Sequence, residues 1–88
     1  MSTITEQFEA AQVAVKKKKK KPGNFDLLAL YANFKQATDG DADGNRPGMT
    51  EFVARAKYDA WAALSGTSKE GAMQSYVDLV NRLVEQDQ

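Results

Sequence analysis

Residues 24–38 read NFDLLALYANFKQAT, and this stretch decides the fold class of the chain. Its apolar residues recur at the spacing that covers one wide face of an α-helix. Asn24 is of a residue type that caps helices, and the Asp-Gly pair at 39–40 ends the pattern. We therefore predict a helix over 24–38, whose apolar face comprises Leu27, Leu28, Leu30, Tyr31 and Phe34.

The helical period continues on both sides of this stretch. Three further helices are predicted to begin after threonines that can cap them, and two of these threonines precede a glutamate by three residues, as in a capping box. The capping residues are Thr3, Thr50 and Thr67, and the predicted helices span 4–18, 51–64 and 68–86. No segment alternates polar and apolar residues. We therefore predict a single all-α domain over 1–88, a four-helix bundle.

The chain of 88 residues contains neither cysteine nor histidine. These absences exclude a disulfide framework, the usual zinc ligands, a nucleophilic thiol and acid–base chemistry through imidazole. A carboxylate-only enzyme is a rival hypothesis, but Asp59 and Glu70 have no evident partners in the sequence. No apolar run approaches the ~20 residues that span a bilayer, and the first residues resemble no secretory signal. We expect a cytoplasmic protein that is not an enzyme.

The segment between the second and third predicted helices contains a candidate calcium motif. Residues 39–44, DGDADG, match the first half of an EF-hand loop, in which oxygen ligands alternate and a glycine allows the turn. The second half does not match, because Thr50 stands where a bidentate glutamate belongs and Arg46 brings a cation to the site. We predict a solvated turn without metal, and a calcium-responsive interaction module is the alternative.

The formal net charge of the chain is zero, although six consecutive lysines occupy residues 16–21. This lysine run can be a solvated helix end that faces the negative pole of the helix dipole, or a segment that binds polyanions. The other six basic residues are outnumbered by twelve acidic ones and form no basic stripe, so we expect no nucleic acid partner. Transient contact with an anionic membrane surface, through Lys16 to Lys21, is a further expectation.

Aromatic and lysine side chains also pair on two of the predicted helices. Tyr31, Phe34 and Lys35 lie at i, i+3 and i+4 and so share one face, while Lys57 and Trp61 form a second i, i+4 pair. Such residues usually belong to a core or extend along its edge. Their spacing alone therefore does not define a site.

The order of these residues is more specific than their spacing. The relevant segments are YANFKQAT at 31–38, GD at 40–41, RPGM at 46–49, AKYDAW at 56–61, GTSKE at 66–70, AM at 72–73 and Tyr76. Together they resemble the acyl-CoA-binding protein family, and the resemblance needs no gap. It implies an up-down-down-up bundle that binds, sequesters and transports one long-chain fatty acyl-CoA ester, as a monomer and without cofactor or catalysis.

The resemblance also implies roles for individual residues. In the family, the position of Tyr31 contacts the nucleotide and that of Phe34 packs on the adenine. The positions of Lys35 and Lys57 pair with the ribose 3′-phosphate, and that of Tyr76 lines the site from the fourth helix. Two leucines beside the acyl chain and one basic residue near the ligand complete the implied site: Leu27, Leu28 and Lys16.

Three departures from the family pattern carry expectations of their own. Phe34 stands where many members have tyrosine, and Val53 replaces a frequent lysine that could meet a phosphate. Gln12 and Lys18 occupy positions of the first helix where small or apolar residues usually pack against the fourth. We therefore expect a loose contact between these two helices, which Lys18→Leu would tighten, raising the unfolding midpoint.

Overall fold

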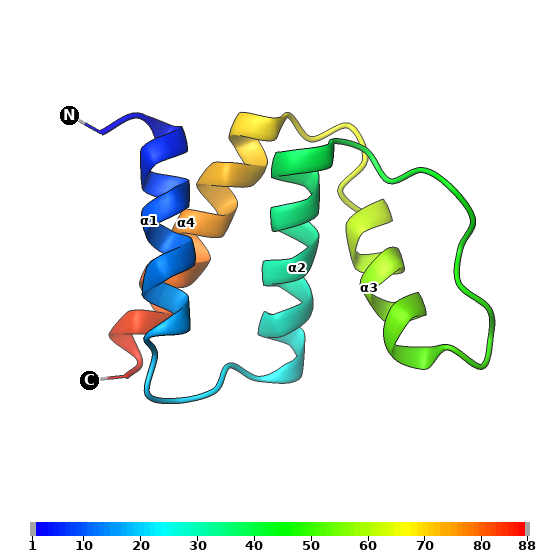
Figure 1. The fold of residues 1–88 in the computed structure, drawn as a ribbon, viewed down its shortest axis with the longest axis horizontal. Helices are drawn as coiled ribbons and strands as arrows, with labels where there is room; N and C mark the ends of the chain where they lie inside the picture. The colour runs from blue at the N-terminus through cyan, green and yellow to red at the C-terminus, as the bar shows by residue number, and fades with distance from the viewer. Residues whose placement is uncertain (1, 88) are drawn as a thin grey trace.

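Four α-helices and no strand make up the part of the chain that the computed structural model describes, residues 2–87. The helices are α1 (Ile4–Lys16), α2 (Asn24–Asp39), α3 (Phe52–Ala62) and α4 (Lys69–Glu85). α1 and α4 run in one direction and α2 and α3 in the other, with a long loop between α2 and α3 (Figure 1). The predicted all-α, up-down-down-up bundle is confirmed. Within this part of the chain, no helix has the length and apolar character needed to cross a membrane.

α4 is the central helix, because it packs against both α1 and α2. The buried core is made by side chains of these three helices: Phe8 and Ala11 from α1, Leu30 and Ala37 from α2, and Ala72, Tyr76, Val77, Val80 and Leu83 from α4. α3 packs against α2 and lies at the side of the bundle (Figure 1). Among the described residues, the core cluster therefore includes no side chain of α3.

The predicted helix ranges agree with the observed bounds to within two residues at each end. At α1 the predicted capping box is present: the Thr3 hydroxyl accepts from the Glu6 backbone N–H at 3.1 Å, and the Glu6 carboxylate accepts from the Thr3 N–H at 2.9 Å. These hydrogen bonds lower the pKa of Glu6. At α4 the cap is Ser68, whose hydroxyl accepts from the Gly71 N–H at 2.9 Å, so the capping box predicted at Thr67 is wrong by one residue.

α2 and α3 begin without a side-chain cap. Asn24 is already the first helical residue of α2, after Gly23 in the capping position, so the prediction that Asn24 caps this helix is wrong. Glu51, not Thr50, precedes α3 in the capping position. The Glu51 carboxylate accepts from the backbone N–H of Gly48 at 3.0 Å, which closes the loop just before the helix.

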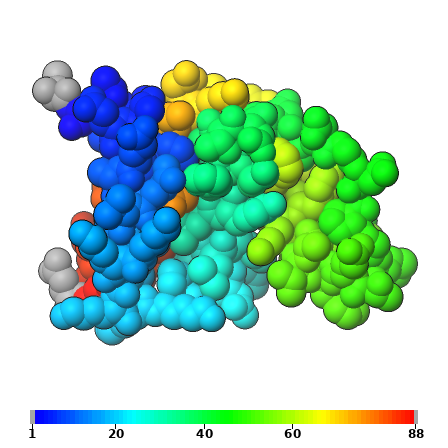
Figure 2. Space-filling view, viewed as in Figure 1, coloured from blue at the N-terminus to red at the C-terminus, as the bar shows by residue number. Residues whose placement is uncertain are grey.

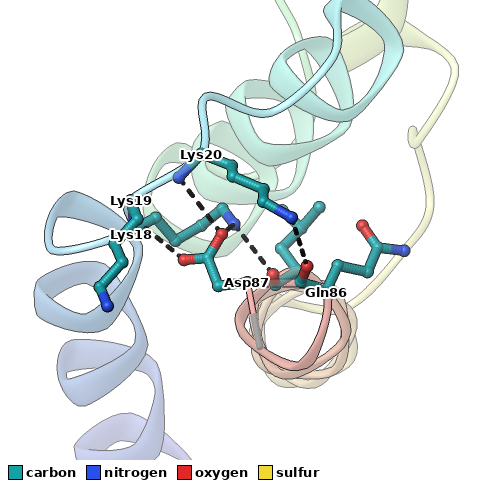
Figure 3. Close-up of polar contacts among 6 residues, drawn as sticks. Lys18, Lys19, Lys20, Gln86 and Asp87 are labelled. Atoms are coloured by element: carbon teal, nitrogen blue, oxygen red, sulfur yellow. Dashed lines mark hydrogen bonds and ion pairs between the residues drawn. The ribbon is translucent and has the colours of Figure 1, made fainter.

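The lysine run leaves the helical path because it binds the C-terminal end of α4 (Figure 3). The Lys18 ammonium lies 2.7 Å from Asp87 Oδ1 and donates to the Leu83 carbonyl oxygen at 2.9 Å. The Asp87 carboxylate also accepts from the backbone N–H groups of Lys19, at 3.0 Å, and Lys20, at 3.2 Å. These N–H groups thus find their partners outside α1, which ends two residues earlier than predicted.

The loose contact expected between the first and last helices is wrong at Lys18. Its side chain is only 5% exposed and is buried together with its counter-ion, Asp87. Gln12, the other residue in question, donates to the Phe8 carbonyl of its own helix at 3.4 Å. Because Lys18→Leu would leave Asp87 and the Leu83 carbonyl without their donor, we now expect this change to lower the unfolding midpoint.

We predict that Asp87→Asn lowers the thermal unfolding midpoint at neutral pH by a few degrees. The hydrogen bond from Lys18 holds the pKa of Asp87 below its ordinary value of 3.8. A lowered pKa in the folded state gives stability that is complete above the unfolded-state pKa and is lost as the pH falls through the folded-state pKa. Variant and wild type should therefore differ at neutral pH and converge in strong acid, as followed by circular dichroism.

Glu85→Gln is the matched control for this prediction. Glu85 is an exposed acid at the end of the same helix, and the described residues give it no ion-pair partner. Removing a negative charge near a helix C-terminus should not destabilise the helix. Equal midpoints for wild type and Asp87→Asn at neutral pH would show that the ion pair contributes no stability.

Candidate functional site

Two adjoining hollows lie between α2 and α3, with volumes of about 380 and 490 Å³. The first, the apolar hollow, is lined by Asn24, Leu27, Leu28, Phe52, Val53, Ala56 and Lys57. The second, the aromatic hollow, is lined by Tyr31, Pro47, Val53, Ala54, Lys57, Tyr58 and Trp61. Val53 and Lys57 belong to both, so the hollows are neighbours that share a wall, and together we call them the α2–α3 groove.

The apolar hollow brings Leu27 and Leu28 of α2 opposite the first turns of α3. Both leucines thus line a hollow, and their place beside an acyl chain stays a prediction from the resemblance. Sequence analysis did not single out Phe52 and Ala56 as lining residues, since an apolar stripe on a helix usually faces a core. Phe52 is instead 78% exposed and Val53 70% exposed, because α3 presents this stripe to the open groove.

The aromatic hollow places a cation over an aromatic ring. The Lys57 ammonium of α3 lies 5.4 Å from the centre of the Tyr31 ring on α2. A second pair crosses between the same helices in the opposite direction, with the Lys35 ammonium of α2 4.9 Å from the Trp61 ring centre. Both contacts have the geometry of cation–π interactions. Three of the site residues implied by the resemblance, Tyr31, Lys35 and Lys57, thus meet where α2 and α3 face each other.

Asp39 holds Lys35 through an i, i+4 ion pair on α2. The hydrogen bond between them raises the pKa of Lys35 and lowers the pKa of Asp39. The two side chains are partly open to solvent, 28% and 49% exposed, so the ion pair contributes little free energy. Lys35 therefore remains a cation that another anion can recruit.

Phe34 and Tyr76 belong to a different group of side chains. Their rings lie 6.4 Å apart and both pack against Phe8 of α1, at 5.9 Å for Phe34 and at 5.1 Å, edge to face, for Tyr76. Tyr76 is buried, and this burial raises the pKa of its hydroxyl. Phe34 keeps about a third of its surface exposed. Neither residue lines the two hollows described above.

Lys16 does not reach the α2–α3 groove. It is the last residue of α1, a helix that packs against α4, and it is exposed. Of the eight residues implied by the resemblance, the groove therefore includes four directly, Leu27, Leu28, Tyr31 and Lys57. Lys35 lies next to the groove, because its ammonium group contacts the ring of Trp61, which lines the aromatic hollow.

A buried glutamine holds together the two chain segments that enter and leave α3. Gln36 of α2 is fully buried, and its Nε2 donates to Asp41 Oδ1 at 2.7 Å and to the Thr67 carbonyl at 2.8 Å. Asp41 Oδ1 also accepts from the backbone N–H of Gly66 at 2.9 Å. These bonds to a charged oxygen keep the pKa of Asp41 low. The position of α3 relative to α2 thus depends on polar contacts.

Two further contacts attach α3 to the preceding loop. The Trp61 indole N–H donates to the Gly40 carbonyl at 2.8 Å. Gly40 has a φ of +83°, a left-handed conformation that favours glycine and lets the chain turn away from the end of α2. Arg46 of the loop binds Asp59 with two hydrogen bonds, at 2.8 and 2.7 Å. Trp61 is therefore fixed in orientation beneath Lys35.

Two of the three acidic residues of the candidate calcium motif are engaged in other contacts. Asp39 pairs with Lys35, and Asp41 accepts from Gln36 and Gly66. Within residues 2–87, no group of three acidic, cysteine or histidine side chains is placed to hold a metal ion. These contacts favour the interpretation of the segment as a structural turn.

Comparison with known proteins agrees with this architecture. A family model described as acyl-CoA-binding protein matches residues 5–80. The crystal structure of Oryza sativa acyl-CoA-binding protein 2 has the same fold, with a TM-score of 0.90 and 40% sequence identity over 94% of this chain and 90% of that one. The fold is thus that of a small helical domain of known type. The chain belongs to the acyl-CoA-binding protein family.

Two curated relatives differ in how much of their length this chain matches. The acyl-CoA-binding protein homolog of Manduca sexta is 46% identical over 83 residues, which cover 93% of this chain and 92% of the relative. The enoyl-CoA delta isomerase 2 of Rattus norvegicus is 49% identical over 83 residues, which cover 94% of this chain. The matched part is only 21% of that isomerase.

Proposed function

We propose that this protein binds one long-chain fatty acyl-CoA ester without chemical conversion, and sequesters and carries it as a monomer in the cytoplasm. The observation that carries the proposal is the composition of the α2–α3 groove, in which an apolar hollow and a cationic, aromatic hollow adjoin and share Val53 and Lys57. An acyl-CoA joins an apolar tail to a polyanionic head group with a flat base. Membership of the family supports the same ligand class.

The apolar hollow is suited to the tail. Leu27, Leu28 and Phe52 offer apolar surface that no other part of the described chain covers. Each methylene group moved from water into such a surface contributes about 0.8 kcal/mol. The affinity should therefore rise with the length of the acyl chain until the hollow is filled.

The aromatic hollow is suited to the head group. We assign the phosphate charges to Lys57 and Lys35, since ammonium groups bind phosphate oxygens strongly when little water intervenes. Tyr31 offers an aromatic ring beside these cations. The roles of Phe34 on the adenine, of Tyr76 and of Lys16 stay predictions from the resemblance, and the partly exposed ring of Phe34 is compatible with stacking.

A carrier role also agrees with the state of the acidic residues. Asp59, a candidate in the rival enzyme hypothesis, is bound by Arg46, and this contact lowers the pKa of Asp59. A general acid or base that works near neutral pH needs a raised carboxyl pKa, which is the opposite shift. This supports ligand binding without catalysis.

We expect calorimetric titration with palmitoyl-CoA to give saturable one-to-one binding. Free CoA and free palmitate, used as controls, should each bind much more weakly, because each fills only one of the two hollows. Absence of palmitoyl-CoA binding by delipidated protein with a normal helical circular dichroism spectrum would refute the proposed function.

Tyr31→Ala and Lys57→Ala should each weaken palmitoyl-CoA binding by about 1 kcal/mol or more, the scale of a lost charged hydrogen bond or aromatic contact. Lys35→Ala should have a similar effect. Lys17→Ala is the matched control, since Lys17 is an exposed lysine at the end of α1 and lines neither hollow. Unchanged affinity in all three site variants would disprove these assignments while leaving the fold intact.

Asp39→Asn should strengthen palmitoyl-CoA binding. The substitution removes the carboxylate that pairs with Lys35 in the ligand-free protein, so the ammonium no longer has to leave a partner before it meets a phosphate. A surface ion pair has a small free energy, and we expect a gain of roughly two- to fivefold that shrinks as salt is added. Titration at two salt concentrations measures it, and weaker binding by the variant would show that Asp39 orients Lys35 instead of competing for it.

A further inference from the structure

Large apolar side chains are exposed at one end of the molecule. Phe25 in the first turn of α2 is 89% exposed, and Met49 and Phe52 at the start of α3 are each 78% exposed. The first turns of α2 and α3 lie at the same end of the bundle (Figure 1). They also border the same cavity, since Asn24 and Phe52 both line the apolar hollow. Such grouped apolar exposure is typical of an interaction surface.

The lysine run lies at this same end. The connection between α1 and α2, which contains most of the run, spans the lower edge of the molecule beside the start of α2 (Figures 1 and 2). Two of its six ammonium groups, those of Lys18 and Lys20, bind the end of α4. The other four find no hydrogen-bond or ion-pair partner among residues 2–87: Lys16, Lys17, Lys19 and Lys21.

Two of the four acidic side chains at this end form ion pairs within the protein, and the other two are Glu51 and Glu85. Asp26 of α2 pairs with Arg82 of α4 at 2.9 Å, and Asp87 pairs with Lys18. Glu51 and Glu85 keep their negative charge at the ends of α3 and α4. The four free lysines outnumber these two glutamates, so the surface carries a positive excess next to exposed phenylalanines.

We propose that this end of the protein, the lysine run together with Phe25, Met49 and Phe52, docks on the surface of an anionic phospholipid bilayer. Cations beside exposed aromatic side chains are the combination that such an interface accepts, since lysines meet lipid head groups while aromatic rings enter the boundary with the acyl chains. Single-stranded nucleic acid fits less well, because it needs cations and stacking rings interleaved along one groove. Here the rings of Phe25 and Phe52 lie on the first turns of α2 and α3, and the lysines lie on a separate connection.

Docking in this orientation brings the first turns of α2 and α3, which border the apolar hollow, next to the lipid. An acyl chain could then pass between bilayer and groove without crossing bulk water, which removes the cost of exposing its methylene groups. This consequence rests on the proposed function. The docking itself does not, because the ligand-free protein already presents all of the surface described.

Flotation with lipid vesicles tests the proposal on the ligand-free protein. We expect binding to vesicles of phosphatidylcholine and phosphatidylserine in equal parts, a fall in binding as salt is added, and little binding to phosphatidylcholine alone. Lys21→Gln should weaken binding about fivefold, the scale of one lysine at an anionic surface. Lys69→Gln, which removes a lysine at the opposite end of the bundle, is the matched control and should leave binding unchanged.

Phe25 separates a bilayer from other polyanions. Phe25→Ser should weaken vesicle binding roughly tenfold, while Phe25→Leu, which keeps an apolar side chain, should largely restore it. Phe25 does not line the α2–α3 groove, so both variants should bind palmitoyl-CoA as the wild type does. Equal vesicle binding by wild type and Phe25→Ser, with equally tight binding of a single-stranded oligonucleotide, would overturn the bilayer assignment in favour of a general polyanion.

Fluorescence quenching by brominated phospholipids tests the depth of insertion. Phe25→Trp should gain an emission that these lipids quench, whereas the wild-type emission should not respond, because Trp61 is only 9% exposed and is bound to the Gly40 carbonyl. Folded wild-type protein that does not float with anionic vesicles at low salt would overturn the proposal, even if it binds palmitoyl-CoA. Vesicle binding without palmitoyl-CoA binding would instead refute the proposed function and leave the docking surface in place.

Discussion

The apolar stripe of α4 is the feature on which the rest of the structure depends. Val80 and Leu83 are almost completely buried in it, and it packs against α1 on one side and α2 on the other. A single helix can pack against two neighbouring helices in this way only if its apolar face is wide. The apolar face of α4 is wide enough to do so. Once α4 has bound both helices, the core is complete without α3. α3 therefore has an apolar face with no partner within the described chain, and this face forms one wall of the groove.

The attachment of α3 differs in kind from the packing of the core. Its ends are held by hydrogen bonds through Gln36, Asp41 and Trp61 and by the paired contact of Arg46 with Asp59. Hydrogen bonds are directional and fix a geometry, whereas apolar packing would close the space between the two helices. The groove can thus stay open in the folded state because polar contacts above it set the separation of α2 and α3. The same contacts place a tryptophan beneath one lysine and a tyrosine beneath the other.

Local periodicity predicted the helices well, because each helix carries enough apolar residues at helical spacing to be recognised alone. It could not predict features that join distant parts of the chain. The early end of α1 depends on Asp87, which lies more than sixty residues from the lysines it binds. The open stripe at Phe52 depends on how α4 divides its surface between two other helices. The family pattern assigned Tyr31, Lys35 and Lys57 to one ligand, and all three lie where α2 and α3 face each other. Lys16, assigned to the same ligand, lies apart from them, since its neighbours in the run turn toward α4.

Identical residues on both sides of Lys18 give its contact an unusual tolerance to changes in chain length. If one lysine were deleted from the run, another would occupy the position after the end of α1, and its ammonium could reach the same carboxylate. The Asp87 carboxylate also accepts hydrogen bonds from the backbone N–H groups of the next two residues in the run. These bonds do not depend on the side chains of those residues. A run of identical residues thereby allows this joint between the two ends of the bundle to keep its contacts when the run is one residue shorter, with only the length of the connection to α2 changed.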